Sequence, residues 1–107
     1  MNTVFAALSN PERRMMLDML REGGRPAGDL VAAFPDLPQP AVSRHLRILR
    51  EAGLVTVVPR AQQRVYSLAP AGLHGVEAWV STYRDFWSGK LGSLSEHLGK
   101  PRSRRQN

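Results

Sequence analysis

The amino-acid sequence predicts a fold that is mainly α with a small β hairpin. Apolar residues recur at helical spacing before residue 54 and again after residue 69. Two short runs that favour β strands, 54–58 and 65–68, lie between these stretches and flank a polar, basic segment. The chain has 107 residues, which suits one domain with a thin core. We expect residues 1–98 to form that domain and residues 99–107 to form a basic, disordered tail.

An Asn-Pro pair divides the first two predicted helices. Residues 3–9 carry apolar side chains at helical spacing. Asn10 suits the N-cap position of a helix and Pro11 its first residue, so the second helix is expected to begin there. It is expected to run to about Glu22, because the glycine pair at 23–24 follows.

Arg13 and Arg14 stand in the first turn of this second helix, where the helix dipole favours acidic residues. Contacts to DNA phosphates would explain this mismatch. A salt bridge to Glu12 or Asp18 would explain it equally well.

A proline-rich turn joins the third and fourth predicted helices. The third helix is expected to open at Arg25, and its apolar stripe ends at Phe34. The turn spans residues 34–40, and the fourth helix follows it and ends at Gly53. Two short helices joined by such a turn form a helix-turn-helix, in which the second helix reads DNA.

The fourth helix has a basic front and an apolar back. Four residues at spacings i, i+3, i+4 and i+7 share its front: Pro40, Ser43, Arg44 and Arg47. Three residues lie on the other side: Val42, Leu46 and Leu49. Arginine can pair with guanine through two hydrogen bonds, and serine can meet bases or phosphates. An ordinary solvated helix face is the alternative, but the turn before and the hairpin after favour DNA contact.

A β hairpin is expected after this helix, with strands at Leu54–Val58 and Val65–Leu68. Its tip contains no glycine, so its turn type does not follow from the residues. After a helix-turn-helix, such a hairpin is the wing of a winged helix-turn-helix. The tip residues predicted to lie near phosphates are Arg60, Gln62, Gln63 and Arg64. The two arginines could instead be edge charges that prevent strand aggregation.

Two further residues complete the predicted DNA-binding set. Gln39 opens the fourth helix. His45 borders the inner face of that helix, so a packing role or a phosphate contact explains it as well as base reading does.

A long last helix is expected from Ala69-Pro70 to about Leu98. Its large apolar residues recur at helical spacing and include Trp79, Tyr83, Phe86, Trp87, Leu91 and Leu94. They are too many for one side of a lone surface helix, so we expect the same helix of a second subunit to cover them. The aromatic cluster could instead line a ligand pocket, although large rings at helical spacing usually supply buried area.

Composition narrows the classes of function. Fifteen Lys and Arg against nine Asp and Glu give a net charge of +6, which suits a polyanionic partner such as double-stranded DNA. Apolar runs are too short for a signal peptide or a membrane span, so a soluble, cytoplasmic chain without membrane contact is expected. No cysteine is present, which excludes disulfides, thiolate metal sites and cysteine nucleophiles. No group of residues suits catalysis, so an enzyme is not expected.

Two segments carry a family resemblance. One is Phe-Ala-Ala-Leu-Ser-Asn-Pro-Glu-Arg-Arg at residues 5–14, and the other is Pro-Ala-Val-Ser-Arg-His-Leu-Arg-Ile-Leu-Arg-Glu-Ala-Gly-Leu-Val at residues 40–55. With the hairpin and the aromatic last helix, they resemble the ArsR family of bacterial winged-helix repressors over nearly the whole chain except the tail. The resemblance implies a homodimer whose first and last helices form the interface, so the expected interface adds Val4, Phe5 and Leu8 to the six residues of the last helix. Its two reading helices would bind an inverted-repeat operator with half-sites about 34 to 36 Å apart.

The chain departs from the metal-sensing members of that family. Where they carry a thiolate motif, residues 30–34 read Leu-Val-Ala-Ala-Phe. The last helix also lacks the usual spacing of carboxylates and histidines, and His74 with Glu77 gives at most two ligands. The chain is more similar to members without a metal site, so no metal or other cofactor is expected. Pro38 stands where a capping Ser or Thr is common, which leaves the capping to Gln39, Asp36 or water.

The sequence therefore predicts a sequence-specific, DNA-binding transcriptional regulator, a homodimeric repressor that needs no metal. A repressor of the same fold that responds to a metal or small ligand is one alternative. A winged-helix protein-interaction module without DNA binding is another, and the retained basic face of the fourth helix speaks against it. The operator, the regulated genes and any inducer do not follow from the residues.

Overall fold

The structure is a computed structural model that describes residues 2–90. The chain divides into two units, Met1–Val76 and Glu77–Asn107. The helices are α1 (Asn2–Leu8), α2 (Pro11–Met19), α3 (Ala27–Ala32), α4 (Gln39–Glu51) and α5 (Pro70–Ser81). The strands are β1 (Arg25–Pro26), β2 (Val55–Arg60) and β3 (Gln63–Leu68). The mainly α fold with a β hairpin is thus confirmed, whereas the expected tail at 99–107 lies outside the described residues.

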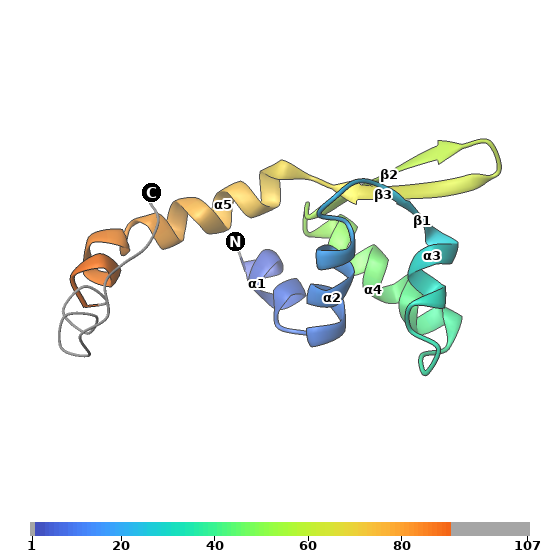
Figure 1. Ribbon diagram of the computed structural model, residues 1–107, viewed down its shortest axis with the longest axis horizontal. Helices are drawn as coiled ribbons and strands as arrows, with labels where there is room; N and C mark the ends of the chain where they lie inside the picture. Colours follow the sequence, from blue (N-terminus) through green and yellow to red (C-terminus); the bar gives the residue numbers. More distant parts are fainter. Residues whose placement is uncertain (1, 91–107) are drawn as a thin grey trace. The chain divides into compact units, whose positions relative to one another are not determined.

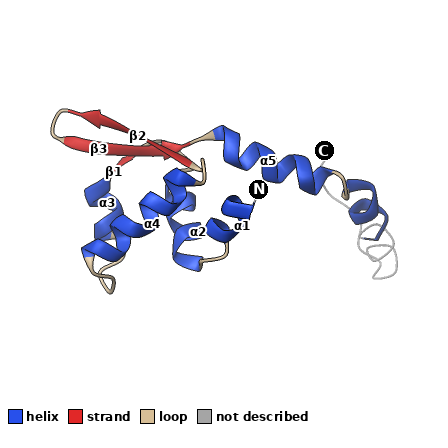
Figure 2. Cartoon of the chain, turned by 180° about the vertical axis from the view of Figure 1, so that it is seen from behind, coloured by secondary structure: helices blue, strands red, loops and turns tan. Residues whose placement is uncertain are grey.

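Within the first unit, α4 is the central helix. It contacts α1, α2 and α3, and the hairpin of β2 and β3 projects beyond the helices (Figures 1 and 2). The side chains that make up the core come from the helices up to α4, from the turns that follow them and from the start of β2: Val4, Ala7, Met16, Leu17, Leu20, Leu30, Phe34, Val42, Leu46, Leu49, Leu54 and Val55. The predicted apolar back of α4 is therefore confirmed as its buried side.

The junction between α1 and α2 follows the sequence prediction. Asn10 is the N-cap of α2, and its Oδ1 accepts a hydrogen bond of 2.9 Å from the backbone N–H of Arg13. The expected end near Glu22 is wrong, because α2 ends at Met19. Turns with N–H groups bonded three residues back, such as Leu20 to Leu17 at 3.0 Å, replace its last helical turn.

The expected start of the third helix at Arg25 is also wrong. Arg25 and Pro26 form β1, which pairs antiparallel with β3 and makes a three-stranded sheet in the order β1-β3-β2. Gly24 allows this approach, since a Cβ at that position would lie 2.6 Å from Ser67 Oγ and 3.2 Å from the carbonyl oxygen of Tyr66. Helix α3 begins only after this strand, at Ala27.

Helix α4 matches its prediction at both ends. No side chain caps its start; instead the Pro38 carbonyl accepts hydrogen bonds from the N–H groups of Ala41 at 2.9 Å and Val42 at 3.3 Å. Neither Gln39 nor Asp36 takes the capping role. At the other end Gly53 has a φ of 77°, and Leu54 N–H bonds to Leu49 O at 3.0 Å, as in a Schellman motif.

The hairpin is longer and its tip tighter than predicted. Both strands extend toward the tip until Arg60 pairs with Gln63, which leaves a two-residue loop. The first loop residue, Ala61, has a φ of 56° and takes the left-handed conformation that glycine usually provides. The missing glycine therefore does not prevent a tight turn.

In the second unit, the expected long helix is interrupted. Helix α5 ends at Ser81, residues 82–83 form a turn, and residues 84–90 are helical again. The hydroxyls of Ser81 and Thr82 donate hydrogen bonds of 2.8 and 2.7 Å to carbonyls three residues earlier, which competes with the regular helical pattern. The predicted continuation to Leu98 lies outside the described residues.

Within residues 2–90, no helix is long and apolar enough to cross a membrane.

Candidate nucleic-acid interface

The exposed front of α4 carries the predicted basic residues. Ser43, Arg44 and Arg47 are all exposed, while the opposite side of the helix is buried in the core. Neither Arg44 nor Arg47 makes a hydrogen bond or an ion pair with any residue in the range 2–90. Both guanidinium groups are therefore available to an anionic ligand.

Arg50 extends this front and was missed by the sequence reasoning. It is exposed and lies three residues after Arg47 in the last turn of α4, on the same side. Its spacing from Arg47 was the signal that could have found it. A cation there also suits the negative end of the helix dipole.

A hollow of about 530 Å³ lies between α3, α4 and β3. Residues of three kinds line it: the small residues Ala27, Gly28 and Ala32; the apolar or aromatic Val31, Leu46 and Tyr66; and the polar Gln39, Ser43 and Arg64. The structure thus brings together three of the predicted DNA-binding residues, from the start of α4 and from the wing. Each of these three side chains carries a hydrogen-bond donor that suits a sugar-phosphate backbone.

The two wing arginines lie on opposite faces of the hairpin. Arg64 pairs with Pro59 and shares a face with Tyr66, whereas Arg60 pairs with Gln63 and shares the other face with Val58. Gln62 lies in the loop between the strands and is exposed. Arg64 therefore belongs to the hollow beside α4, and Arg60 and Gln63 do not.

His45 is turned toward α2. Its side chain is only 14% exposed, with Nδ1 3.1 Å from Arg13 Nη1 and Nε2 3.6 Å from Glu12 Oε1. Burial, and next the charge of Arg13, lower the pKa of His45 below its ordinary value. Of the roles that the sequence left open, packing is the one that this position favours.

Arg13 and Arg14 form no ion pair with Glu12 or Asp18, the salt-bridge partners considered from the sequence. Arg13 donates hydrogen bonds to the carbonyls of Ala7 at 2.8 Å and Ala6 at 3.1 Å, and Arg14 donates to the carbonyl of Leu8 at 2.7 Å. These carbonyls end α1 and have no partner within that helix. The two arginines therefore cap α1 from the neighbouring helix, a role that no local spacing signals.

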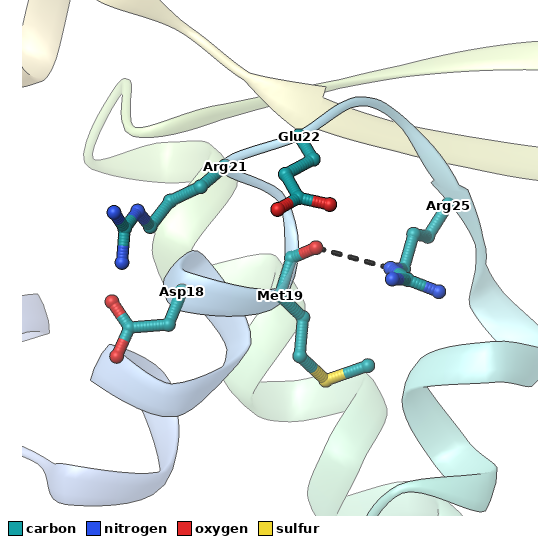
Figure 3. A pocket seen from close by; sticks show the side chains of 5 residues that line it. All are labelled: Asp18, Met19, Arg21, Glu22 and Arg25. Atoms are coloured by element: carbon teal, nitrogen blue, oxygen red, sulfur yellow. Dashed lines mark hydrogen bonds between the residues drawn. The ribbon is translucent and has the colours of Figure 1, made fainter.

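A second hollow, of about 380 Å³, lies beside the end of α2 and contains two acidic and two basic side chains (Figure 3). Arg25 reaches back across it, and its Nε donates a hydrogen bond of 3.0 Å to the carbonyl of Met19. Arg25 also lies 3.8 Å from Asp29. These contacts tie β1 to α2 and α3, so this hollow has a structural role.

In the part of the chain that the structure describes, no three His, Asp or Glu residues gather as a metal site would need. Glu77, considered with His74 as a ligand pair, instead forms an ion pair of 2.8 Å with Arg84. His97, which the notion of a histidine ligand on the last helix also covers, lies outside the described residues.

The expected dimer-interface residues fall into four groups. Val4 is 8% exposed and belongs to the core of its own chain. Leu8 packs partly against the core, and Phe5 is partly exposed. Leu91 and Leu94 lie outside the described residues. The aromatic residues of the second unit, which we call the aromatic patch, are about half exposed: Trp79, Tyr83, Phe86 and Trp87.

The four rings of the aromatic patch contact one another in two pairs. The rings of Trp79 and Tyr83 meet edge to face with centroids 5.3 Å apart, and those of Phe86 and Trp87 with centroids 6.1 Å apart. The Lys90 ammonium lies 5.6 Å from the centroid of the Phe86 ring. So many large rings exposed in one short segment are typical of an interaction surface.

Similarity to known proteins independently supports a DNA-binding transcriptional regulator. Residues 8–58 match the family described as a helix-turn-helix domain. The chain is 36% identical over 83 residues to the transcriptional repressor SdpR of Bacillus subtilis. The aligned region covers 78% of this chain and 91% of that protein. It is 40% identical over 87 residues to the HTH-type transcriptional regulator Rv2034 of Mycobacterium tuberculosis. This aligned region covers 81% of this chain and 78% of that protein. The crystal structure of an ArsR family transcriptional regulator superposes with a TM-score of 0.72 and 26% identity, over 81% of this chain and 89% of that one.

Proposed function

Because this chain belongs to the ArsR family of winged helix-turn-helix proteins and is a DNA-binding transcriptional regulator, we propose that it acts as a homodimeric repressor. Its two reading helices, each an α4, bind an inverted-repeat operator and need no metal ion. Bound there, the dimer obstructs transcription. Such a protein works where the chromosome lies, in the cytoplasm.

The observation that carries the proposal is the exposed front of α4. Arg44 and Arg47 stand on a helix whose other side is fixed in the core, and neither guanidinium is engaged by the described part of the chain. An exposed guanidinium that no residue of the fold engages can bind a base edge or a phosphate without breaking a contact of the fold. The wing adds Arg64 on the same side as the start of α4.

The aromatic patch supports the dimer. Its four large rings are about half exposed, and Trp87 alone is 52% exposed. Covering such rings with a second copy would bury a substantial apolar area. A dimer also places two reading helices on one DNA molecule, and the second contact then gains from the high effective concentration that the first one creates.

Metal independence rests on the ligands that the chain offers. It contains no cysteine, so thiolate sites are excluded over its whole length. Glu77 is already paired with Arg84. We therefore expect DNA binding to be insensitive to a chelator.

Fluorescence anisotropy with labelled duplexes tests the proposal directly. The duplexes come from upstream of the gene for this protein and are compared with shuffled copies, at several salt concentrations, with and without chelator. We expect tight, chelator-insensitive binding to one native duplex. Loss of that binding in chelator would point to a metal-responsive repressor. Weak, equal binding to every duplex would make the basic front a generic charge and favour a protein-interaction module.

The dimer has its own test in Trp87→Asp, with Met15→Asp as the matched control. Met15 is 53% exposed on α2, as exposed as Trp87, but it lies outside the aromatic patch. We expect the Trp87 variant to be monomeric in sedimentation and to lose tight binding, because bivalent contact is lost. The Met15 variant should remain a dimer. A dimeric Trp87→Asp protein would overturn the assigned interface.

A further inference from the structure

Arg13 joins three elements of the first unit through one planar group. Its Nε and Nη2 donate hydrogen bonds to the carbonyls of Ala7 and Ala6, at 2.8 and 3.1 Å, at the end of α1. Its Nη1 lies 3.1 Å from Nδ1 of His45, on α4. Arg13 itself belongs to α2. One guanidinium therefore fixes the reading helix against the end of α1.

The hydrogen-bonding chemistry of this contact allows one arrangement. A guanidinium is always a donor and never an acceptor, so Nδ1 of His45 must accept and the ring must be neutral, with its proton on Nε2. That Nε2 faces Glu12 Oε1 at 3.6 Å. The charged groups that act on the ring are Arg13 and Glu12 from α2 and Arg44 from α4 itself. The partly buried ring agrees with a neutral histidine.

The position of His45 makes this contact relevant to DNA reading. It follows Arg44 directly in α4 and points to the side of the helix opposite to solvent. A small roll of α4 about its axis would move the ends of Arg44 and Arg47 much further than its backbone, because their side chains are long. Base recognition through paired hydrogen bonds tolerates little displacement.

We propose that Arg13 and His45 are positioning residues, which set the orientation of α4 so that Arg44 and Arg47 meet base edges, without touching DNA themselves. The proposal rests on the function proposed above. It goes beyond that function by assigning a role in operator recognition to a contact between α1, α2 and α4 away from the DNA. It also predicts that operator binding and non-specific binding respond differently to changes at these two residues.

The test begins with a duplex that the wild-type protein selects from a random-sequence library, and with a shuffled copy of it. Anisotropy then gives the affinity of each variant for both duplexes at several salt concentrations. Arg13→Lys keeps the charge but cannot reach both carbonyls and the ring. His45→Leu removes the acceptor, and His45→Asn keeps an acceptor oxygen near the place of Nδ1. Arg14→Lys is the matched control, because Arg14 binds only the carbonyl of Leu8.

We expect Arg13→Lys and His45→Leu to bind the selected duplex about tenfold more weakly, the scale of one misplaced base contact. Binding to the shuffled duplex and the dependence of log K on log[salt] should stay unchanged, since no phosphate contact is lost. His45→Asn should recover most of the affinity, and Arg14→Lys should stay within about twofold of wild type, as surface changes usually do. Thermal melts followed by circular dichroism establish that each variant is folded at the assay temperature.

Three results would overturn the inference while leaving the proposed function intact. One is an equal loss on both duplexes with a salt slope lowered by about one, which identifies a phosphate contact. Another is a His45→Asn protein as weak as His45→Leu, and the third is a loss in Arg14→Lys as large as in Arg13→Lys. If the wild-type protein enriches no duplex from the library, the proposed function fails first, and this inference fails with it.

Discussion

The arginines of α2 and those of α4 lie in the same small unit, yet the first pair binds the fold itself and the second pair faces solvent. Arg13 and Arg14 donate hydrogen bonds to carbonyls at the end of α1. Arg44 and Arg47 face solvent and bind nothing in residues 2–90. The difference lies in the neighbouring atoms, because carbonyls in the last turn of α1 lie within hydrogen-bond distance of Arg13 and Arg14. Net charge alone therefore does not identify a DNA-binding surface.

The largest effect should come from removing both α4 arginines. Arg44→Ala with Arg47→Ala should cost about 2 to 6 kcal/mol of operator binding, at about 1 to 3 kcal/mol for each base contact. The free energy of unfolding should change by less than about 0.5 kcal/mol, because neither side chain has a partner among residues 2–90. Anisotropy and urea unfolding measure the two quantities. A fall in stability as large as the fall in affinity would erase the distinction between the two pairs.

The next effect should appear in stability at Arg13. Arg13→Ala removes two hydrogen bonds from a charged donor to carbonyls and one contact with His45, so we expect a loss of about 2 to 3 kcal/mol in the free energy of unfolding. Arg14→Ala removes a single exposed hydrogen bond and should cost about 1 kcal/mol or less. Urea denaturation of both variants gives the comparison. Equal, negligible losses would show that the capping of α1 contributes little.

A smaller effect should follow pH through His45. Because the pKa of His45 is lowered below 6.5 in the folded state, the unfolded chain binds the proton more readily. The free energy of unfolding should therefore be highest above this value and should fall as pH drops below about 6.5, levelling off once the folded-state pKa is passed. Urea titrations between about pH 8 and pH 5 measure it, with His45→Asn as the control that should lose this component. A rise in stability over the same range, absent from the control, would mean that Glu12 outweighs burial and Arg13.

The smallest effect should come from the loop between the two wing arginines. Ala61 has a φ of 56°, a conformation that costs an L-residue about 1 kcal/mol or more. Ala61→Gly should raise the free energy of unfolding by up to about 1 kcal/mol and leave the faces of Arg60 and Arg64 unchanged. Operator affinity should stay within about twofold, as for other substitutions that remove no contact. Thermal unfolding with anisotropy measures both effects, and a large gain or loss in affinity would show that the loop itself meets DNA.

Part of this structure could be predicted because its signals are local. The two faces of α4 follow from residue spacing along one helix, and the Asn10 cap depends on atoms only three residues apart. The wrong predictions concern features that helical spacing does not reveal. Strand β1 exists only because β3, about forty residues later, offers it backbone partners. The break after Ser81 reflects hydroxyl groups that compete for the helix carbonyls, although every neighbouring residue fits a helical pattern.

The candidate site divides in the same way. Spacing was enough to select Ser43, Arg44 and Arg47, because a periodic pattern specifies which residues share a face before the helix has any neighbours. It could not tell that Arg60 and Arg64 lie on opposite faces of the wing, since that depends on the length of the loop and the pairing of the strands.

Residue spacing in this chain thus defines which helix reads DNA and which of its sides is buried. Only the packing of the folded chain determines which partners each arginine binds. Arg13 is engaged because the end of α1 and the ring of His45 are brought within hydrogen-bond distance of it, and those atoms come from segments up to 32 residues away. Periodicity is a property of neighbouring residues, whereas hydrogen-bond acceptors are supplied by whatever the folded chain places nearby.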